Sequence, residues 1–164
     1  MLLGYWITWE GIQPLSSKVQ AMMNIKAPTS KKELQGFIGL INYYRDMWVR
    51  RSHILAPLAK LTSKTTAWKW GQEEQKAFNQ MKKVISQEVL LAYPDFNKEF
   101  VIHTTDASNY QLGAVISQDQ KPIAFYSRKL KPEQTRYTTM ERELLGIVET
   151  LKEYHNVLLG HQIK

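Results

Sequence analysis

EFVIHTTDASNYQLGAVIS, residues 99–117, places a single aspartate, Asp106, between two apolar runs of β-prone residues. The first run ends at Asp106, a small polar turn follows, and the second run covers residues 112–117. This pattern predicts two strands joined by a short turn. A lone aspartate at the end of a strand usually forms the turn, because its carboxylate accepts hydrogen bonds from nearby backbone N–H groups. A chemical role for Asp106 therefore needs support from the rest of the chain.

The residues that follow complete a small sheet and a helix. KPIAFYSRKL, residues 121–130, predicts a third strand, and residues 138–159 predict a long helix. Thr138 and Glu141 have the spacing of a capping box at its start, and Gly160 ends it. Three consecutive strands with short turns form an antiparallel meander, and the helix is expected to pack on one of its faces.

The residues before this sheet predict a short hairpin followed by helices. LLGYWITWEGI, residues 2–12, alternates bulky β-formers and ends at a glycine turn. In the longest helical segment, Ser30 and Glu33 have capping-box spacing, and apolar residues recur on one face. The chain is therefore predicted to be α+β. The expected helices cover residues 14–28, 29–48, 52–62 and 72–87.

Composition and charge narrow the classes of function. The 164 residues include no cysteine, which excludes disulfide partners and thiolate metal sites, and no apolar run approaches the length of a membrane span. We place a domain boundary near Asp95. Residues 1–95 carry 13 Lys and Arg against 7 Asp and Glu, whereas residues 96–164 carry 9 against 8. The basic half indicates either a polyanionic partner or only a soluble basic surface.

A second acidic residue, Glu143, lies at the edge of the expected apolar stripe of the last helix. A carboxylate facing the sheet is unfavourable unless an arginine or a metal ion compensates its charge. On helix geometry alone, a simpler interpretation is that Glu143 reaches solvent or pairs with Arg142 or Arg136. The stripe expected to be buried consists of Leu144, Ile147, Val148, Leu151 and Leu158.

Taken together, Asp106 and Glu143 suggest a metal site. Asp106 ends the first strand of the meander, and Glu143 lies in the first turns of the helix that crosses it. Two carboxylates that converge on one sheet edge repel each other unless a cation lies between them. Hard oxygen ligands suit Mg²⁺. We therefore interpret both residues as candidate Mg²⁺ ligands.

The residues that carry this pair resemble a known family. TDASNYQLGAVISQDQKPIAFYSRKLKPEQTRYTTMERELLGIVETLKEYHNVLLG, residues 105–160, resembles the start of the ribonuclease H domain of gypsy-type LTR-retrotransposon Pol polyproteins. LGYWITWEGIQPLSSKVQAM, residues 3–22, resembles the end of the reverse-transcriptase palm. APTSKKELQGFIGLINYYRDMW and PLAKLTSKTTAWKWGQEEQKAFNQMKKVI resemble its thumb and connection. The resemblance implies a helical thumb/connection segment after a short hairpin, then a truncated ribonuclease H-like three-stranded meander with one packed helix.

The resemblance also implies roles for the two acids. Asp106 and Glu143 match the first two catalytic carboxylates of a cluster that holds two Mg²⁺ ions and hydrolyses the RNA strand of an RNA–DNA hybrid. The chain has no Asp-Asp dipeptide, so we expect the polymerase aspartates upstream of Met1 and the further ribonuclease acids beyond Lys164. This fragment is expected to hold at most one Mg²⁺ ion weakly and to be inactive by itself.

By residue match, one helix is expected to follow the minor groove of the template–primer duplex. Gln35, Gly39 and Tyr43 are spaced i, i+4, i+8 and lie together on one side of it. Gln35 can hydrogen-bond to groove edges, Gly39 permits close backbone approach, and Tyr43 can pack on a ribose. The simpler alternatives are close helix–helix packing at Gly39 and an ordinary half-buried aromatic at Tyr43. Further candidate nucleic-acid contacts are Lys31, Lys32 and Arg45 for phosphates and Leu3, Gly4 and Tyr5 of the primer-grip hairpin.

We therefore interpret the chain as a fragment of a retrotransposon reverse transcriptase/ribonuclease H. The expected partners are a DNA duplex or RNA–DNA hybrid and the remainder of the Pol polyprotein, without a membrane. The whole enzyme would copy RNA into DNA and hydrolyse RNA in hybrids, inside the cell, in the cytoplasm or in virus-like particles. The alternative is a retrotransposon-derived, non-catalytic module that binds nucleic acid or protein.

Overall fold

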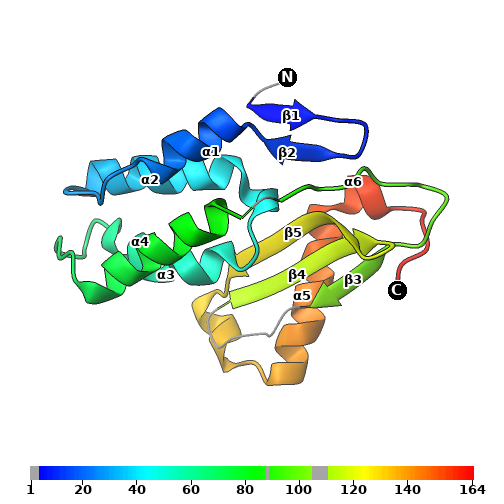
Figure 1. Ribbon diagram of the computed structural model, residues 1–164. Helices are drawn as coiled ribbons and strands as arrows, with labels where there is room; N and C mark the ends of the chain where they lie inside the picture. Colours follow the sequence, from blue (N-terminus) through cyan, green and yellow to red (C-terminus); the bar gives the residue numbers. More distant parts are fainter. Residues whose placement is uncertain (1–3, 88, 105–110) are drawn as a thin grey trace.

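The computed structural model describes residues 4–87, 89–104 and 111–164. A hairpin and a helical bundle occupy one side of the molecule, and a three-stranded sheet with its own helix occupies the other (Figure 1). The α+β class and the element order predicted from the sequence are confirmed. The elements are β1 (Tyr5–Ile7), β2 (Ile12–Pro14), α1 (Ser16–Met23), α2 (Lys31–Tyr43), η1 (Arg45–Met47), α3 (Arg51–Leu61), α4 (Gln72–Ile85), β3 (Val101–Thr104), β4 (Gln111–Gln118), β5 (Lys121–Lys129), η2 (Pro132–Arg136), α5 (Thr139–Glu153) and α6 (His155–Leu158).

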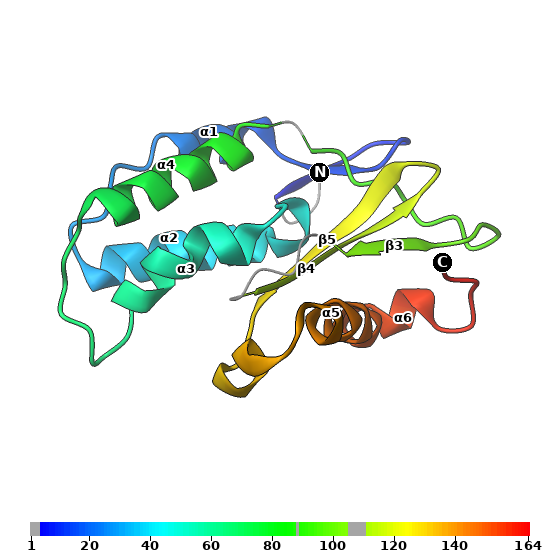
Figure 2. The ribbon, with the colours of Figure 1, turned by 90° about the horizontal axis from the view of Figure 1, so that it is seen from below.

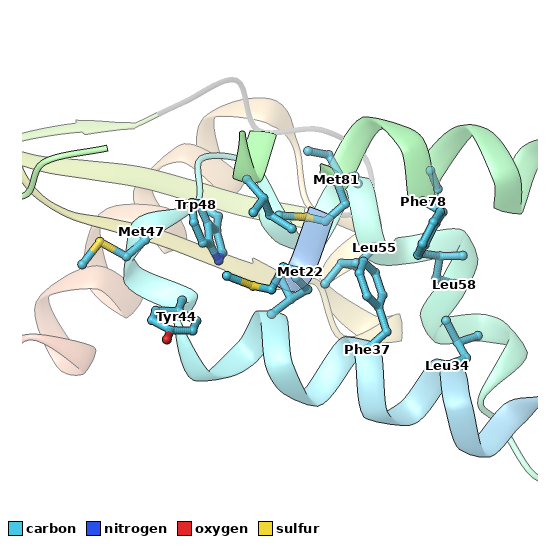
Figure 3. Close-up of a cluster of buried hydrophobic side chains, with 14 of the residues drawn as sticks. Met22, Leu34, Phe37, Tyr44, Met47, Trp48, Leu55, Leu58, Phe78 and Met81 are labelled. Atoms are coloured by element: carbon cyan, nitrogen blue, oxygen red, sulfur yellow. The ribbon is translucent and has the colours of Figure 1, made fainter. Parts of the chain in front are cut away.

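The helical bundle has one continuous hydrophobic core. Leu34, Phe37 and Ile41 of α2 are buried at helical spacing. Figure 3 shows Leu34 and Phe37 pointing toward the side chains of α3 and α4. The rings of Phe37 and Phe78 lie 4.8 Å apart between α2 and α4. Ser30 caps α2 as predicted, because its hydroxyl accepts a hydrogen bond from the Glu33 backbone N–H. The face of α2 opposite to this core is thereby left on the surface.

The second half contains the predicted antiparallel meander, in the order β3-β4-β5. Val101 pairs with Ser117 across the first pair of strands, and Val115 pairs with Phe125 across the second. The last residues of the chain run beside β3: Phe100 N–H donates to the Gln162 carbonyl and Lys164 N–H donates to the Phe100 carbonyl. Phe100 and Ile163 therefore form an isolated parallel β-bridge at this edge of the sheet.

Helix α5 packs on the sheet with a different face from the one predicted. Leu144 is 61% exposed, and Ile147 and Val148 are each 37% exposed, so the prediction that they are buried is wrong. The buried residues are Arg142, Gly146 and Thr150. A Cβ at Gly146 would lie 3.7 Å from the Thr104 side chain, an ordinary van der Waals distance, so this side of the helix lies against β3. The expected single helix is also divided at Tyr154 into α5 and α6.

Strand β5 separates the two halves and contacts both. Ala124 and Tyr126 belong to the hydrophobic clusters shared with β4, α5 and α6. Phe125 packs against the core of the bundle, and the Ser127 hydroxyl accepts a hydrogen bond from the Ser52 backbone N–H at the start of α3. Alternate side chains of β5 thus face opposite sides of the sheet. Figure 2 shows α5 on one side and the bundle on the other.

Backbone hydrogen bonds join the hairpin to the segment that leads to the sheet, and that segment to β5. Ile12 exchanges backbone hydrogen bonds with Leu91, at 2.8 and 2.9 Å, in the segment that leads to the sheet. Ala92 N–H donates to the Pro122 carbonyl at 2.8 Å. The segment after residue 88 therefore ties the hairpin to β5. In the part of the chain that the structure describes, no helix is both long enough and apolar enough to cross a bilayer.

Candidate nucleic-acid interface

The exposed side of α2 carries the three residues predicted to follow a duplex. Gln35 and Gly39 are exposed, and the Tyr43 side chain is 52% exposed. A Cβ placed on Gly39 would meet nothing within 4 Å, so close helix packing does not explain this glycine. The three residues share one face because the opposite face is held in the core. The resulting surface has the Gln35 amide at one end and the Tyr43 ring at the other. At its centre, the helix backbone of Gly39 is exposed.

The hairpin meets this surface at its aromatic end. The Tyr5 ring centroid lies 6.1 Å from that of Tyr43 and 5.1 Å from that of Tyr44. The Tyr5 hydroxyl donates to the Tyr43 carbonyl at 3.3 Å, and the Tyr44 hydroxyl donates to the Gly4 carbonyl at 3.2 Å. Gly4 has a φ of +87°, and a Cβ there would lie 2.7 Å from the Tyr44 hydroxyl. Two candidate groups far apart in sequence therefore form one surface; Leu3 lies outside the described residues.

Burial of Tyr5 in this contact affects its ionisation. Desolvation raises the pKa of Tyr5 to about 12, and the neighbouring Tyr43, Tyr44 and Asp46 add to the shift. The neutral phenol is therefore the form present near neutral pH. It remains a hydrogen-bond donor to the Tyr43 carbonyl, which holds the hairpin against the end of α2.

The three basic candidates occupy different environments. The Lys31 ammonium donates to the carbonyls of Ser63 and Thr66, at 2.6 and 2.5 Å, and so holds the loop after α3. Arg45 forms a 2.6 Å ion pair with Glu153 of α5. Lys32 is exposed. Lys31 and Arg45 thus have structural contacts that the sequence did not reveal, whereas Lys32 is open to a phosphate.

The structure describes only one of the two acidic candidates. Asp106 lies outside the described residues, two positions after the end of β3 at Thr104. Glu143 is exposed on α5, one helical turn before Gly146, which packs against Thr104. The helix therefore brings Glu143 toward the end of the strand that leads to Asp106. Within residues 4–87, 89–104 and 111–164, no group of three or more His, Cys, Asp or Glu side chains is placed to share a metal ion.

Side chains at the junction of the two halves were missed by the sequence analysis. The Tyr154 hydroxyl donates to the Asp46 carboxylate at 2.7 Å, and burial together with this anion raises the pKa of Tyr154. Arg51 donates to the Ser127 carbonyl at 3.1 Å and also contacts Asn42. No local pattern marks these residues, because each contact joins elements that are distant in the chain.

Comparisons with known proteins identify this arrangement. Residues 70–164 match the family model of the RNase H-like domain found in reverse transcriptase. The chain is 40% identical over 161 residues to the retrovirus-related Pol polyprotein from transposon 297 of Drosophila melanogaster, covering 98% of this chain and 15% of that protein. It is 32% identical over 161 residues to the transposon Tf2-3 polyprotein of Schizosaccharomyces pombe, covering 95% of this chain and 12% of that protein. It thus spans a small part of these relatives.

Solved structures extend the likeness to the whole chain. The foamy viral protease-reverse transcriptase dRH in complex with double-stranded DNA is 26% identical, with a TM-score of 0.86 over 99% of this chain and 29% of that chain. The foamy viral protease-reverse transcriptase in complex with an RNA/DNA hybrid has the same identity and TM-score, over 99% of this chain and 22% of that chain. The match to the family model covers more than half of the residues, and the chain therefore belongs to the family of RNase H-like domains found in reverse transcriptases.

Proposed function

We propose that this chain holds a template–primer duplex on the exposed face of α2, as part of a retrotransposon reverse transcriptase. The observation that carries the proposal is the surface formed by Gln35, Gly39 and Tyr43, with Tyr5 of the hairpin packed against its end. The foamy viral structures that share this fold are complexes with double-stranded DNA and with an RNA/DNA hybrid, which supports a duplex as the ligand.

Each residue of this surface has a distinct task in the proposal. Gly39 lets sugars approach the helix backbone, because no side chain stands between them. The Gln35 amide hydrogen-bonds to groove edges, and the Tyr43 ring packs on a sugar. Lys32, in the first turn of the same helix, contacts a phosphate. Contacts of this kind position a duplex without reading its sequence.

The proposal assigns the two acids to the ribonuclease chemistry of the longer polyprotein. Asp106 and Glu143 would hold Mg²⁺, because carboxylate oxygens suit this hard cation. The contact of Gly146 with Thr104 supports this assignment, since Glu143 precedes Gly146 by one helical turn and Asp106 follows Thr104 by two positions in the sequence. Bound Mg²⁺ would supply an activated water and stabilise the leaving oxygen. Polymerisation and hydrolysis of the RNA strand would be activities of the whole polyprotein.

Replacing Gly39 with alanine should raise the stability of the chain but lower its affinity for a duplex. Gly36 is the matched control, because it lies on the same helix and its Cβ would also meet nothing within 4 Å. Each substitution should raise the free energy of unfolding by about 0.5–1 kcal/mol, since alanine loses less conformational entropy in a helix. Gly39→Ala should weaken duplex binding by about fivefold, which is about 1 kcal/mol. Gly36→Ala should weaken it less, because Gly36 lies one turn away toward the edge of the same exposed face. Fluorescence anisotropy with a labelled RNA–DNA hybrid measures the affinity.

The salt dependence provides a second measurement on the same proteins. Wild-type affinity should fall steeply between low and physiological salt and should not depend on base sequence. Equal affinities of the wild type and the Gly39→Ala and Gly36→Ala variants would overturn the assignment of α2. A strong sequence preference would show that the duplex is read elsewhere.

The metal proposal predicts weak binding and no hydrolysis by the chain alone. Two carboxylates are too few to hold two Mg²⁺ ions about 4 Å apart against their mutual repulsion. Calorimetric titration should therefore detect at most one weakly bound ion, and Glu143→Gln should remove it. Glu141→Gln is a matched exposed control on the same helix. Cleavage of a labelled RNA–DNA hybrid by the purified chain would contradict the proposal.

A further inference from the structure

A mostly apolar cavity lies where the hairpin, the end of α2 and the sheet meet. Its volume is about 490 Å³, which falls in the range of small-molecule sites. Four tyrosines line it: Tyr5 of β1, Tyr43 of α2, Tyr93 of the connecting segment and Tyr154 between α5 and α6. The rest of the wall is largely aliphatic, including Leu91, Ile116, Ile123 and Val157.

Among the described residues that line this cavity, Asp46 is the one that carries a charge. One carboxylate oxygen accepts the Tyr154 hydroxyl at 2.7 Å, and the Arg45 Nε lies 3.7 Å from the same oxygen. The stronger ion pair of Arg45, at 2.6 Å, is with Glu153. Arg45 and Arg51 line a second cavity of about 180 Å³ that shares Asp46 and Tyr154, and neither arginine lines the larger one. The larger cavity is therefore apolar, aromatic and locally acidic.

The aromatic walls are held in place by their own hydrogen bonds. The Tyr5 hydroxyl donates to the Tyr43 carbonyl at 3.3 Å, and the Tyr93 hydroxyl donates to the Thr8 carbonyl at 3.0 Å. The Tyr154 hydroxyl is held by Asp46. Because these hydroxyls are engaged, the rings are ordered before any ligand arrives. A preorganised site loses less conformational entropy on binding than one that must order its side chains.

We propose that this cavity binds a small organic cation, an ammonium group carried on an apolar body. Several tyrosine rings attract a cation through their quadrupoles, and the Asp46 carboxylate adds a direct charge interaction. The aliphatic residues would bury the apolar body of the ligand. Anions such as nucleotide phosphates are disfavoured by Asp46. The cavity shares Tyr5 and Tyr43 with the duplex surface on α2, and Asp46 and the aliphatic wall make it chemically different from that surface.

The test uses the full 164-residue chain and benzyltrimethylammonium as the probe. Methyl-labelled protein is titrated by NMR, and the methyl signals of Ile116, Ile123 and Val157, which line the cavity, report on occupancy. The expected result is saturable shifts that are largest at these methyl groups. Benzyl alcohol keeps the ring but has no charge, and it should bind at least about tenfold more weakly. Equal affinity of the two probes would overturn the proposal.

A charge variant and a wall variant make the test specific. Asp46→Asn removes the charge but keeps an oxygen that can accept the Tyr154 hydroxyl, and it should weaken binding of the cation at least about tenfold with little effect on benzyl alcohol. Asp119→Asn is the matched control, because Asp119 is an exposed acid paired with Lys98 outside the cavity. Should Asp46→Asn unfold the chain, Tyr93→Leu replaces a 41% exposed wall residue and should weaken the cation selectively. Unchanged affinity in a folded variant, or shifts centred elsewhere, would refute the site.

Discussion

Replacing Gly11 with alanine should destabilise the chain by about 3 kcal/mol, because the new Cβ is both strained and obstructed. Gly11 has a φ of +157°, which side chains rarely adopt. A Cβ would overlap the carbonyl oxygen of Leu91 and lie 2.9 Å from the Leu91 carbonyl carbon. That oxygen accepts the hydrogen bond from Ile12 N–H, so the hairpin would have to separate from the segment leading to the sheet. Urea unfolding measures the loss.

Two other glycines separate strain from obstruction. Gly160 has a φ of +83° but open space around its Cβ position, so Gly160→Ala should lose only about 1–2 kcal/mol. Gly36→Ala combines helical backbone with open space and should be stabilising. The predicted order of stability is therefore Gly36→Ala, wild type, Gly160→Ala and Gly11→Ala. A Gly11→Ala chain as stable as Gly160→Ala would show that the contact with Leu91 is not rigid.

Phe78→Ala should lower the free energy of unfolding by about 3–5 kcal/mol, because it empties a position in the bundle core. Phe78 is 2% exposed, and its ring lies 4.8 Å from that of Phe37 and 6.0 Å from that of Trp70. Alanine would leave a cavity between α2 and α4 that the surrounding rings cannot fill without moving. Thermal unfolding followed by tryptophan fluorescence reports the change close to Trp70.

Leu144→Ala is the control for that loss, since it removes an apolar side chain that is 61% exposed on α5. A change within about 0.5 kcal/mol is expected at such a surface position. A large loss of stability in Leu144→Ala would instead support the prediction from sequence that this side of α5 is buried. A small loss at Phe78 would mean that the bundle core repacks easily.

The faces of α2 could be predicted from sequence because a single local pattern decides them. Leu34, Phe37 and Ile41 recur at helical spacing, and they oppose Gln35 and Gly39, so one periodicity sets both the core and the exposed surface. The meander could be predicted for the same reason, since each of its short turns joins strands that are neighbours in the sequence. The family resemblance added the roles of the exposed residues, which periodicity cannot supply.

The orientation of α5 could not be predicted in the same way. Its sequence offers an apolar stripe that includes Leu144 and Ile147, and also a narrower row of Gly146 and Thr150. The side of the helix with Gly146 and Thr150 is buried, and Gly146 lies near Thr104, a tertiary contact with no local signal. The contacts of Tyr154 with Asp46 and of Tyr5 with Tyr43 were missed for the same reason. Each joins residues from different elements.

The alternating side chains of β5 pack into both halves, so we expect the two halves to unfold together. Ala124 and Tyr126 pack in the hydrophobic clusters of the sheet and its helices. Phe125 packs against the bundle core and Ser127 accepts a hydrogen bond from Ser52, so one strand contributes to the packing of both halves. Cleavage between the halves would expose Phe125 and remove the partner of the Ser52 N–H. The halves are therefore not interchangeable modules, and a recombinant that exchanges one half must preserve the matching face of β5.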